Sequence, residues 1–104
     1  MARDCINFPI YLRDDPRTER VSKELGAYSG SVLFGIAMTW GEAGNHTPDD
    51  GIIRGEVNAI LRRLDLIARI GGFGQAMLDA GLLVAIEGGV EVSGYAEMHV
   101  EEDE

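Results

Sequence analysis

The sequence is poor in the residues that build metal, redox and membrane-spanning sites. Its 104 residues include one cysteine, Cys5, and two histidines, His46 and His99. Cys5 has no partner for an internal disulfide or a thiolate zinc site, which favours a reducing compartment. No run approaches the roughly 20 apolar residues of a membrane span, and no signal-peptide pattern is present. We therefore expect a cytoplasmic protein with no metal, no cofactor and no membrane partner.

Positive charge is missing from the last third of the chain. Residues 1–70 contain all 9 Lys and Arg residues and 10 acidic residues, a net charge of −1. Residues 71–104 have no Lys or Arg and a net charge of −8, carried by Asp79, Glu87, Glu91, Glu97, Glu101, Glu102, Asp103 and Glu104. This asymmetry indicates either an acidic tail or a role in binding a basic partner, and solubility is the alternative explanation.

Recognisable catalytic and nucleotide-binding motifs are also missing. The glycine-rich pieces GEAG (41–44) and GGFG (71–74) lack the lysine of a phosphate-binding loop and a preceding strand at dinucleotide-binding spacing. No acidic pair accompanies a nucleophile or base in a familiar arrangement. We therefore expect a binding protein rather than an enzyme and assign no catalytic residue.

The first half of the chain contains clear helix signals. Asp15, followed by a proline, begins a helix that Gly26 ends. A second helix begins at Ser29 or Ser31 and continues through SVLFGIAMTWGEA, where apolar residues cover much of its circumference. This pattern predicts a central, buried helix with Trp40 as a core anchor.

A loop and two further helices follow. Residues 44–51 (GNHTPDDG) predict a loop, after which residues 52–53 add a short strand. Residues 55–71 have the apolar spacing of a third helix, with a break near Asp65. Residues 73–80 (FGQAMLDA) predict a short helix that stops at a glycine.

Strand patterns stand at the two ends of the chain. Residues 6–12 (INFPIYL) alternate as an extended segment that its proline confines to a sheet edge. Residues 82–86 and 90–95 predict a hairpin joined by Glu-Gly-Gly. We therefore expect one α+β domain over residues 1–98, followed by an acidic tail over residues 99–104.

This order of elements is that of a winged helix-turn-helix: three to four helices, a short N-terminal edge strand and a C-terminal two-stranded wing. The stretches YLRDDPRTERVSKELG, DGII and MLDAGLLVAIEGGVEV, together with a His-containing segment, resemble the N-terminal winged-helix domain of phage replication-initiation (replisome-organiser) proteins. The resemblance covers about 90 residues, carries no catalytic signature and implies a small phage protein. It also implies double-stranded DNA binding, from which the acidic wing and tail depart.

Two functions follow from these features. In the first, the acidic wing and tail bind a bacterial protein at the basic surface that holds its nucleic acid, as small phage inhibitors of bacterial defence such as anti-CRISPR proteins do. The cytoplasm in question is then that of the bacterial host. The residues assigned to the partner are Glu87, Glu91, Glu97, Glu101 and Glu102.

The alternative function is DNA binding by a replication initiator or transcription regulator. The third helix would then be the recognition helix, and the residues assigned to DNA are Arg54, Arg62, Arg63 and Arg69. Such a binder relies on counterion release from about 6 to 10 phosphates, and 18 acidic residues oppose it. A homodimer, formed through the second helix or an edge strand, stays possible in either case.

Overall fold

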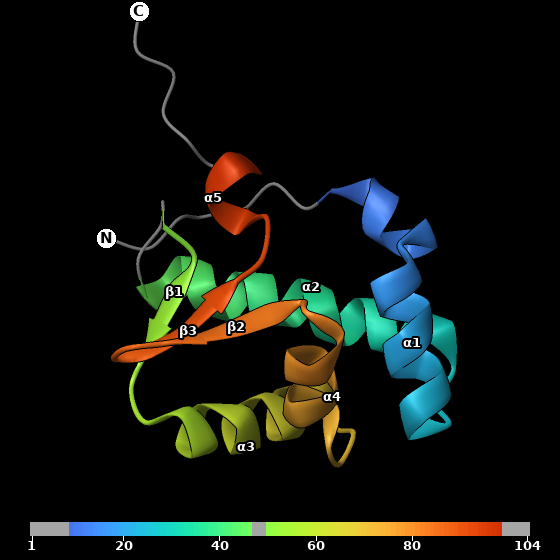
Figure 1. The fold of residues 1–104 in the computed structure, drawn as a ribbon. Helices are drawn as coiled ribbons and strands as arrows, with labels where there is room; N and C mark the ends of the chain where they lie inside the picture. The colour runs from blue at the N-terminus through green and yellow to red at the C-terminus, as the bar shows by residue number, and fades with distance from the viewer. Residues whose placement is uncertain (1–8, 47–49, 99–104) are drawn as a thin grey trace, which may run out of the picture.

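The structure, a computed structural model, describes residues 9–46 and 50–98, which form helices packed around a small antiparallel sheet (Figure 1). In chain order the elements are a 3-10 helix η1 (Ile10–Asp14), α1 (Pro16–Leu25), α2 (Ser29–His46), β1 (Ile52–Arg54), α3 (Val57–Ala68), α4 (Phe73–Ala80), β2 (Leu83–Ile86), β3 (Gly89–Val92) and α5 (Tyr95–Met98). The predicted α+β class is confirmed. The described residues contain five α-helices rather than three or four.

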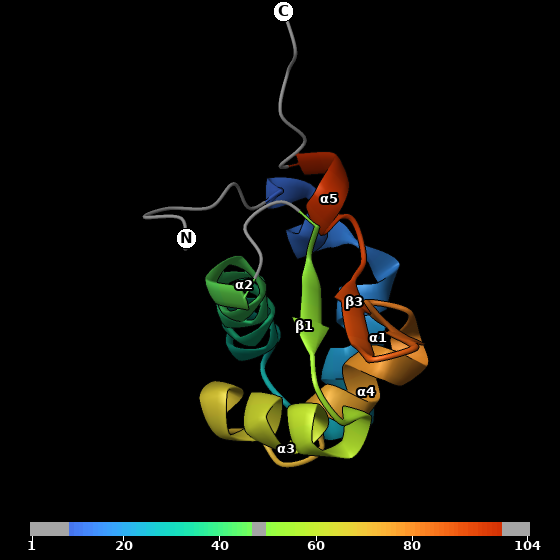
Figure 2. The ribbon, with the colours of Figure 1, turned by 90° about the vertical axis from the view of Figure 1, so that its left-hand side faces the viewer.

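Strand β3 lies at the centre of the sheet, with β1 and β2 antiparallel on its two sides. Glu91 of β3 is opposite Ile52 of β1 and Val84 of β2. The predicted strand at residues 52–53 is therefore confirmed, and it joins the hairpin to make three strands. Helix α2 covers one face of the sheet, behind it in Figure 1 and to its left in Figure 2. The opposite face, which we call the outer sheet face, turns toward the reader in Figure 1.

The hydrophobic core lies between the inner sheet face and the helices. Ile53 of β1 and Val90 and Val92 of β3 point into it, and Trp40 of α2 is 1% exposed. Each Val, Leu or Ile that is fully buried stabilises the fold by about 1.5–3 kcal/mol before entropy is counted. The predicted core role of Trp40 is confirmed.

Helix α1 follows the local signals at both of its ends. The carboxylate of Asp15 accepts the backbone N–H of Arg17 at 2.8 Å, which caps the first turn. The Arg17 guanidinium also binds Asp15 at 2.8 and 3.0 Å, and reaches the carbonyl oxygen of Gly81 at 3.4 Å. Gly26 ends the helix in the left-handed conformation at φ 62°. Asp15 thus connects the start of α1 to the end of α4 through one guanidinium.

Acid should weaken this capping arrangement selectively. The side-chain hydrogen bond from Arg17 holds the pKa of Asp15 below its ordinary value of 3.8, against the opposing effect of burial. A depressed pKa contributes stability that is present above about pH 4 and is lost as the pH falls through the lower pKa of the folded state. We expect the free energy of unfolding of Asp15→Asn, measured in urea, to change less between pH 5 and pH 2 than that of the wild type.

Asp79→Asn is the matched control for this measurement. Asp79 is exposed on α4, and within the described part of the chain its carboxylate accepts a hydrogen bond from Gln75 but forms no ion pair. Its substitution should leave the acid dependence of the wild type in place. Equal pH dependence for wild type and Asp15→Asn would contradict the assigned role of the Arg17 contact.

Helix α2 departs from its predicted boundaries and burial. It begins at Ser29 as expected, but it continues to His46, so residues 44–46 are helical and not part of a loop. Residues 47–49 of that predicted loop lie outside the described residues. The helix is buried on one side only, since Phe34 is 62% and Met38 42% exposed. The prediction of a helix buried around much of its circumference is therefore wrong for this face.

Helix α3 passes through Asp65 without the predicted break. The Asp65 side chain instead accepts the backbone N–H groups of Gly72 at 3.1 Å and Gly74 at 2.7 Å, which caps the following helix. Helix α3 ends at Ala68, and the next residue, Arg69, adopts the left-handed conformation at φ 60°. Helix α4 occupies the predicted residues 73–80 and stops at Gly81.

Both ends of the predicted sheet need correction. Residues 10–12 are helical in η1, where Leu12 is buried and Ile10 is 76% exposed, so they do not share a strand face. Residues 6–8 of the predicted edge strand lie outside the described residues. At the other end β3 stops at Val92, and Tyr95 begins α5 rather than ending a strand. The Tyr95 ring is buried 5.2 Å from that of Trp40, between ring centroids.

Candidate functional site

The outer sheet face combines aliphatic side chains with a carboxylate at its centre. The strand register places Ile52, Glu91 and Val84 in one row across the three strands. Arg54, Gly89 and Ile86 form the next row toward the hairpin turn. Val84 is 46% exposed and Glu91 is half-buried, because aliphatic neighbours flank it on both sides. A carboxylate in such surroundings is positioned by the sheet rather than by a flexible loop.

Three of the five predicted acidic contact residues lie in the described part of the chain, in the hairpin or just after it. Glu87 is exposed in the turn between β2 and β3, Glu91 lies on β3, and Glu97 is exposed on α5. Figure 1 shows the turn and α5 at opposite ends of this part of the molecule, with β3 between them. Glu101 and Glu102, with the rest of the predicted acidic tail (99–104), lie outside the described residues. The structure therefore brings Glu87 and Glu91 onto one hairpin, with Glu97 beyond its far end.

Arg54 is the only Lys or Arg in β1, β2 and β3, and its charge is compensated. Its guanidinium lies 3.1 Å from the carboxylate of Asp50, just before β1. The backbone N–H of Gly55 donates to the carbonyl oxygen of Gly88 at 2.9 Å, which fastens the end of β1 to the hairpin turn. Because Asp50 balances Arg54, the charge of Glu91 is left over on the sheet.

The four arginines predicted for DNA do not share one surface. Arg54 is on the sheet, whereas Arg62 and Arg63 are on α3 and Arg69 ends that helix. Arg63 donates from Nε to the nearly buried carboxylate of Glu42 at 2.7 Å, and this bond raises the Arg63 pKa. Within the described part of the chain Arg62 and Arg69 form no ion pair. Only these two arginines thus offer uncompensated positive charge on the outer side of α3.

The Glu42 contact was missed by sequence reasoning. Glu42 of α2 is buried, and its Oε2 atom lies 2.7 Å from Arg63 and 3.4 Å from Nε2 of His46. The spacing of Glu42 and His46, four residues apart on a helix, was the available signal. Nothing local indicated the partner on α3. The contact fixes α2 against α3 and removes Arg63 as a free cation.

Helix α4, which precedes the hairpin directly, presents no basic side chain. Its eight residues contain no Lys or Arg, and its exposed polar residues Gln75 and Asp79 are hydrogen-bonded to each other at 2.9 Å. It packs against both α1 and α3. The backbones of α4 and α3 come close together at Gly74, where a methyl group would lie 2.9 Å from Cα of Leu61. Sequence reasoning chose α3 as the recognition helix and did not consider α4.

Two further features of the described ranges concern metal binding and membrane spanning. Residues 9–46 and 50–98 contain no group of three or more His, Cys, Asp or Glu side chains placed to hold a metal ion. Their helices also lack the combined length and apolarity that crossing a bilayer requires.

Comparisons with known proteins leave the family open. No protein-family model, curated protein or solved structure matches the chain. The functional argument therefore depends on the geometry of the chain itself.

Proposed function

We propose that the protein is a non-enzymatic binding protein that uses a winged-helix arrangement, with the β2–β3 hairpin as the wing. The succession α2, β1, α3, α4 and hairpin, with β1 paired to β3, supports this assignment. In this assignment α2 is the first helix of the winged-helix motif, and η1 and α1 precede the motif. The resemblance to the N-terminal domain of phage replication-initiation proteins remains part of this proposal.

The proposed activity is binding of a basic protein surface by the outer sheet face. One observation carries this proposal: Glu91 stands in the middle of the sheet between Ile52 and Val84, and Glu87 follows at the hairpin turn. Aliphatic neighbours exclude water from around a charge pair and so strengthen the attraction between its two charges. They also pack against the methylene groups of an arginine or lysine. The face therefore fits a partner that presents Arg or Lys side chains above apolar surface.

The partner class we propose is a bacterial protein whose basic surface binds nucleic acid. Basic surfaces of that kind are built to attract rows of negative charge, and acidic side chains on a rigid sheet imitate part of such a row. A protein bound there would exclude DNA or RNA from the site. The protein would then act as an inhibitor of the anti-CRISPR type, in the cytoplasm of a bacterial host.

DNA binding is the weaker alternative. Only Arg62 and Arg69 of the four assigned arginines are free of ion pairs among the described residues, and a competent binder typically neutralises several phosphates. The wing would also bring Glu87 and Glu91 toward the phosphate backbone. Repulsion there would offset much of the attraction by two arginines.

Reversing the wing charge is expected to remove partner binding. Glu87→Lys/Glu91→Lys should weaken capture of the bacterial partner by roughly tenfold to a hundredfold, about 1.4–2.7 kcal/mol, because two attractions become repulsions. The measurement is affinity purification from a bacterial lysate with the full chain, with and without nuclease, followed by titration of the retained protein. The matched control is Glu19→Lys/Glu24→Lys, which makes the same charge change on exposed residues of α1.

Two results would contradict the proposal. Equal retention by the wing variant and the wild type would remove the outer sheet face from binding. Sub-micromolar binding to random duplex DNA by fluorescence anisotropy, weakening steeply with added salt, would favour the DNA-binding alternative. Retention that survives nuclease and is lost only with the wing variant supports the proposal.

A further inference from the structure

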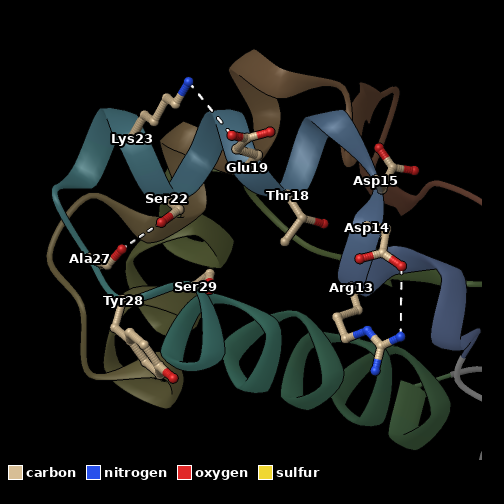
Figure 3. Close-up of a pocket in the computed structure, with 10 residues that line it drawn as sticks. All are labelled: Arg13, Asp14, Asp15, Thr18, Glu19, Ser22, Lys23, Ala27, Tyr28 and Ser29. Atoms are coloured by element: carbon tan, nitrogen blue, oxygen red, sulfur yellow. Dashed lines mark hydrogen bonds and ion pairs between the residues drawn. The ribbon is translucent and has the colours of Figure 1, made fainter.

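A groove between α1 and α2 lies apart from the outer sheet face. Figure 3 shows its walls: α1 above, the first turn of α2 below, and the connection between them at one end. Its volume is about 570 Å³, within the range of roughly 300–1,000 Å³ that holds small organic ligands. It is lined by Arg13, Asp14, Asp15, Thr18, Glu19, Ser22, Lys23, Ala27, Tyr28 and Ser29.

Thr18 is the residue in this groove that is hardest to explain by folding alone. Its side chain points from α1 toward α2, into the middle of the groove (Figure 3). The residue is 2% exposed, and its Oγ1 atom has no hydrogen-bond partner among the described residues. Buried hydroxyl groups are normally hydrogen-bonded, and an exception calls for an explanation such as a ligand that supplies the partner. Because the Oγ1 atom itself is buried, a molecule in the groove would meet it only after the Thr18 side chain rotates.

The start of α2 offers a second set of unused donors. Helix α2 has 18 residues, and in the described part of the chain the backbone N–H groups of Ser29, Gly30 and Ser31 have no acceptor. The first bond of the helix is donated by Val32 to the carbonyl oxygen of Tyr28, at 3.1 Å. Free N–H groups and the positive end of the helix dipole attract an anion such as a carboxylate. Lys23 lies on α1 at the same end of the groove, where its ammonium group faces Glu19 (Figure 3), and its exposed side chain is free to turn toward an anion at the start of α2.

Acidic residues around the groove limit the charge of what can bind. Glu19 lies 3.6 Å from Lys23, and Asp14 lies 3.7 Å from Arg13; all four of these side chains are well exposed, so both pairs are weak. The carboxylate of Asp15 already forms an ion pair with Arg17. The rim is thus close to neutral, which disfavours a multiply charged anion. The two exposed carboxylates instead suit a cationic group some distance from the start of α2.

We propose that this groove binds a small zwitterion of the amino-acid or short-peptide type. The carboxylate of the ligand accepts hydrogen bonds from the first turn of α2 beside Lys23. Its ammonium group lies against Asp14 or Glu19, and the part between them meets the hydroxyl group of Thr18. The site is separate from the outer sheet face and does not depend on the function proposed for that face.

Triglycine is the probe that tests this site. We would titrate the ¹⁵N-labelled full chain with triglycine up to about 10 mM, a range in which a site of roughly millimolar affinity saturates. Saturable shifts are expected for the backbone amides of Ser29, Gly30 and Ser31. N-acetyl-triglycine lacks the ammonium group and triglycine amide lacks the carboxylate, so each should bind at least about fivefold more weakly.

Variants separate binding from folding. Thr18→Val keeps the shape of the side chain, so it should fold with an unchanged or higher Tm and bind triglycine about fivefold more weakly. Lys23→Gln provides a second, exposed position with the same expected loss. Arg20→Gln, on α1 but outside the groove lining, is the matched control and should bind as the wild type does.

The proposal is overturned by any of three results. These are the absence of saturable shifts at the first turn of α2, equal affinity for triglycine and either capped peptide, or wild-type affinity in both Thr18→Val and Lys23→Gln. Loss in the two groove variants with the Arg20→Gln control intact supports it.

Discussion

Gly89→Ala is expected to separate β1 from the hairpin and to lower the free energy of unfolding by roughly 3 kcal/mol. A methyl group at position 89 would overlap the carbonyl oxygen of Ile53 and would lie 3.0 Å from Cα of Arg54. Both are backbone atoms of the paired strand, so a side-chain rotation cannot relieve the overlap. The register that places Glu91 between Ile52 and Val84 would be lost with the pairing.

Urea unfolding followed by circular dichroism measures this effect. Gly71→Ala is the matched control, because a methyl group there meets no atom within 4 Å and the backbone conformation is not left-handed. We expect the control to unfold within about 0.5 kcal/mol of the wild type. Wild-type stability in Gly89→Ala would mean that β1 is not held against β3 as described.

Tyr95→Ala is expected to destabilise the protein by about 3–5 kcal/mol, the usual cost of truncating a large buried aromatic residue. Tyr95 is fully buried, and its ring packs against that of Trp40 on α2. It also covers Gly51, where a methyl group would lie 2.6 Å from Cβ of Tyr95. Truncation would therefore leave a cavity between α2, the start of β1 and α5.

Thermal and urea unfolding of Tyr95→Ala should be compared with Tyr28→Ala. Tyr28 is 79% exposed, so the same truncation there removes little buried surface and should change the free energy of unfolding by less than about 0.5 kcal/mol. Near-equal destabilisation of the two variants would show that the contact between Tyr95 and Trp40 does not anchor the end of the chain.

Both positions matter for the proposed function because they fix the outer sheet face. Gly89 allows the close pairing of β1 with β3, and Tyr95 holds the chain that leaves β3. Neither residue is proposed to touch the partner. Mild destabilising substitutions at either site should therefore reduce partner binding in proportion to the loss of folded protein, whereas the wing charge variant should lose binding while remaining folded.

The carboxylates proposed to bind the partner and the arginines of α3 lie on different elements. The hairpin and α5 carry Glu87, Glu91 and Glu97, whereas the outer side of α3 carries Arg62 and Arg69. Arg63 stands beside these two but is bound to Glu42. The proposed basic partner would be attracted to the acidic residues and repelled by the two arginines, so the arginines would help to orient the complex even without contact.

The sequence alone determined the features that depend on a few neighbouring residues. Asp15 with its following proline begins α1, and Gly26 ends it, because capping and left-handed glycine act within one helical turn. The same holds for the short helix that Gly81 stops and for the glycine-containing hairpin turn. The charge asymmetry of the chain was likewise readable by counting.

Only the tertiary structure decided which distant residues meet. The pairing of Ile52 with Glu91, the bond from Arg63 to Glu42 and the burial of Tyr95 against Trp40 join residues far apart in the chain. No local pattern encodes such pairs, because each depends on how whole elements pack around a shared core. For the same reason the sequence identified Glu87 and Glu91 as candidates but could not place Glu91 between aliphatic side chains, and it did not reveal the groove around Thr18.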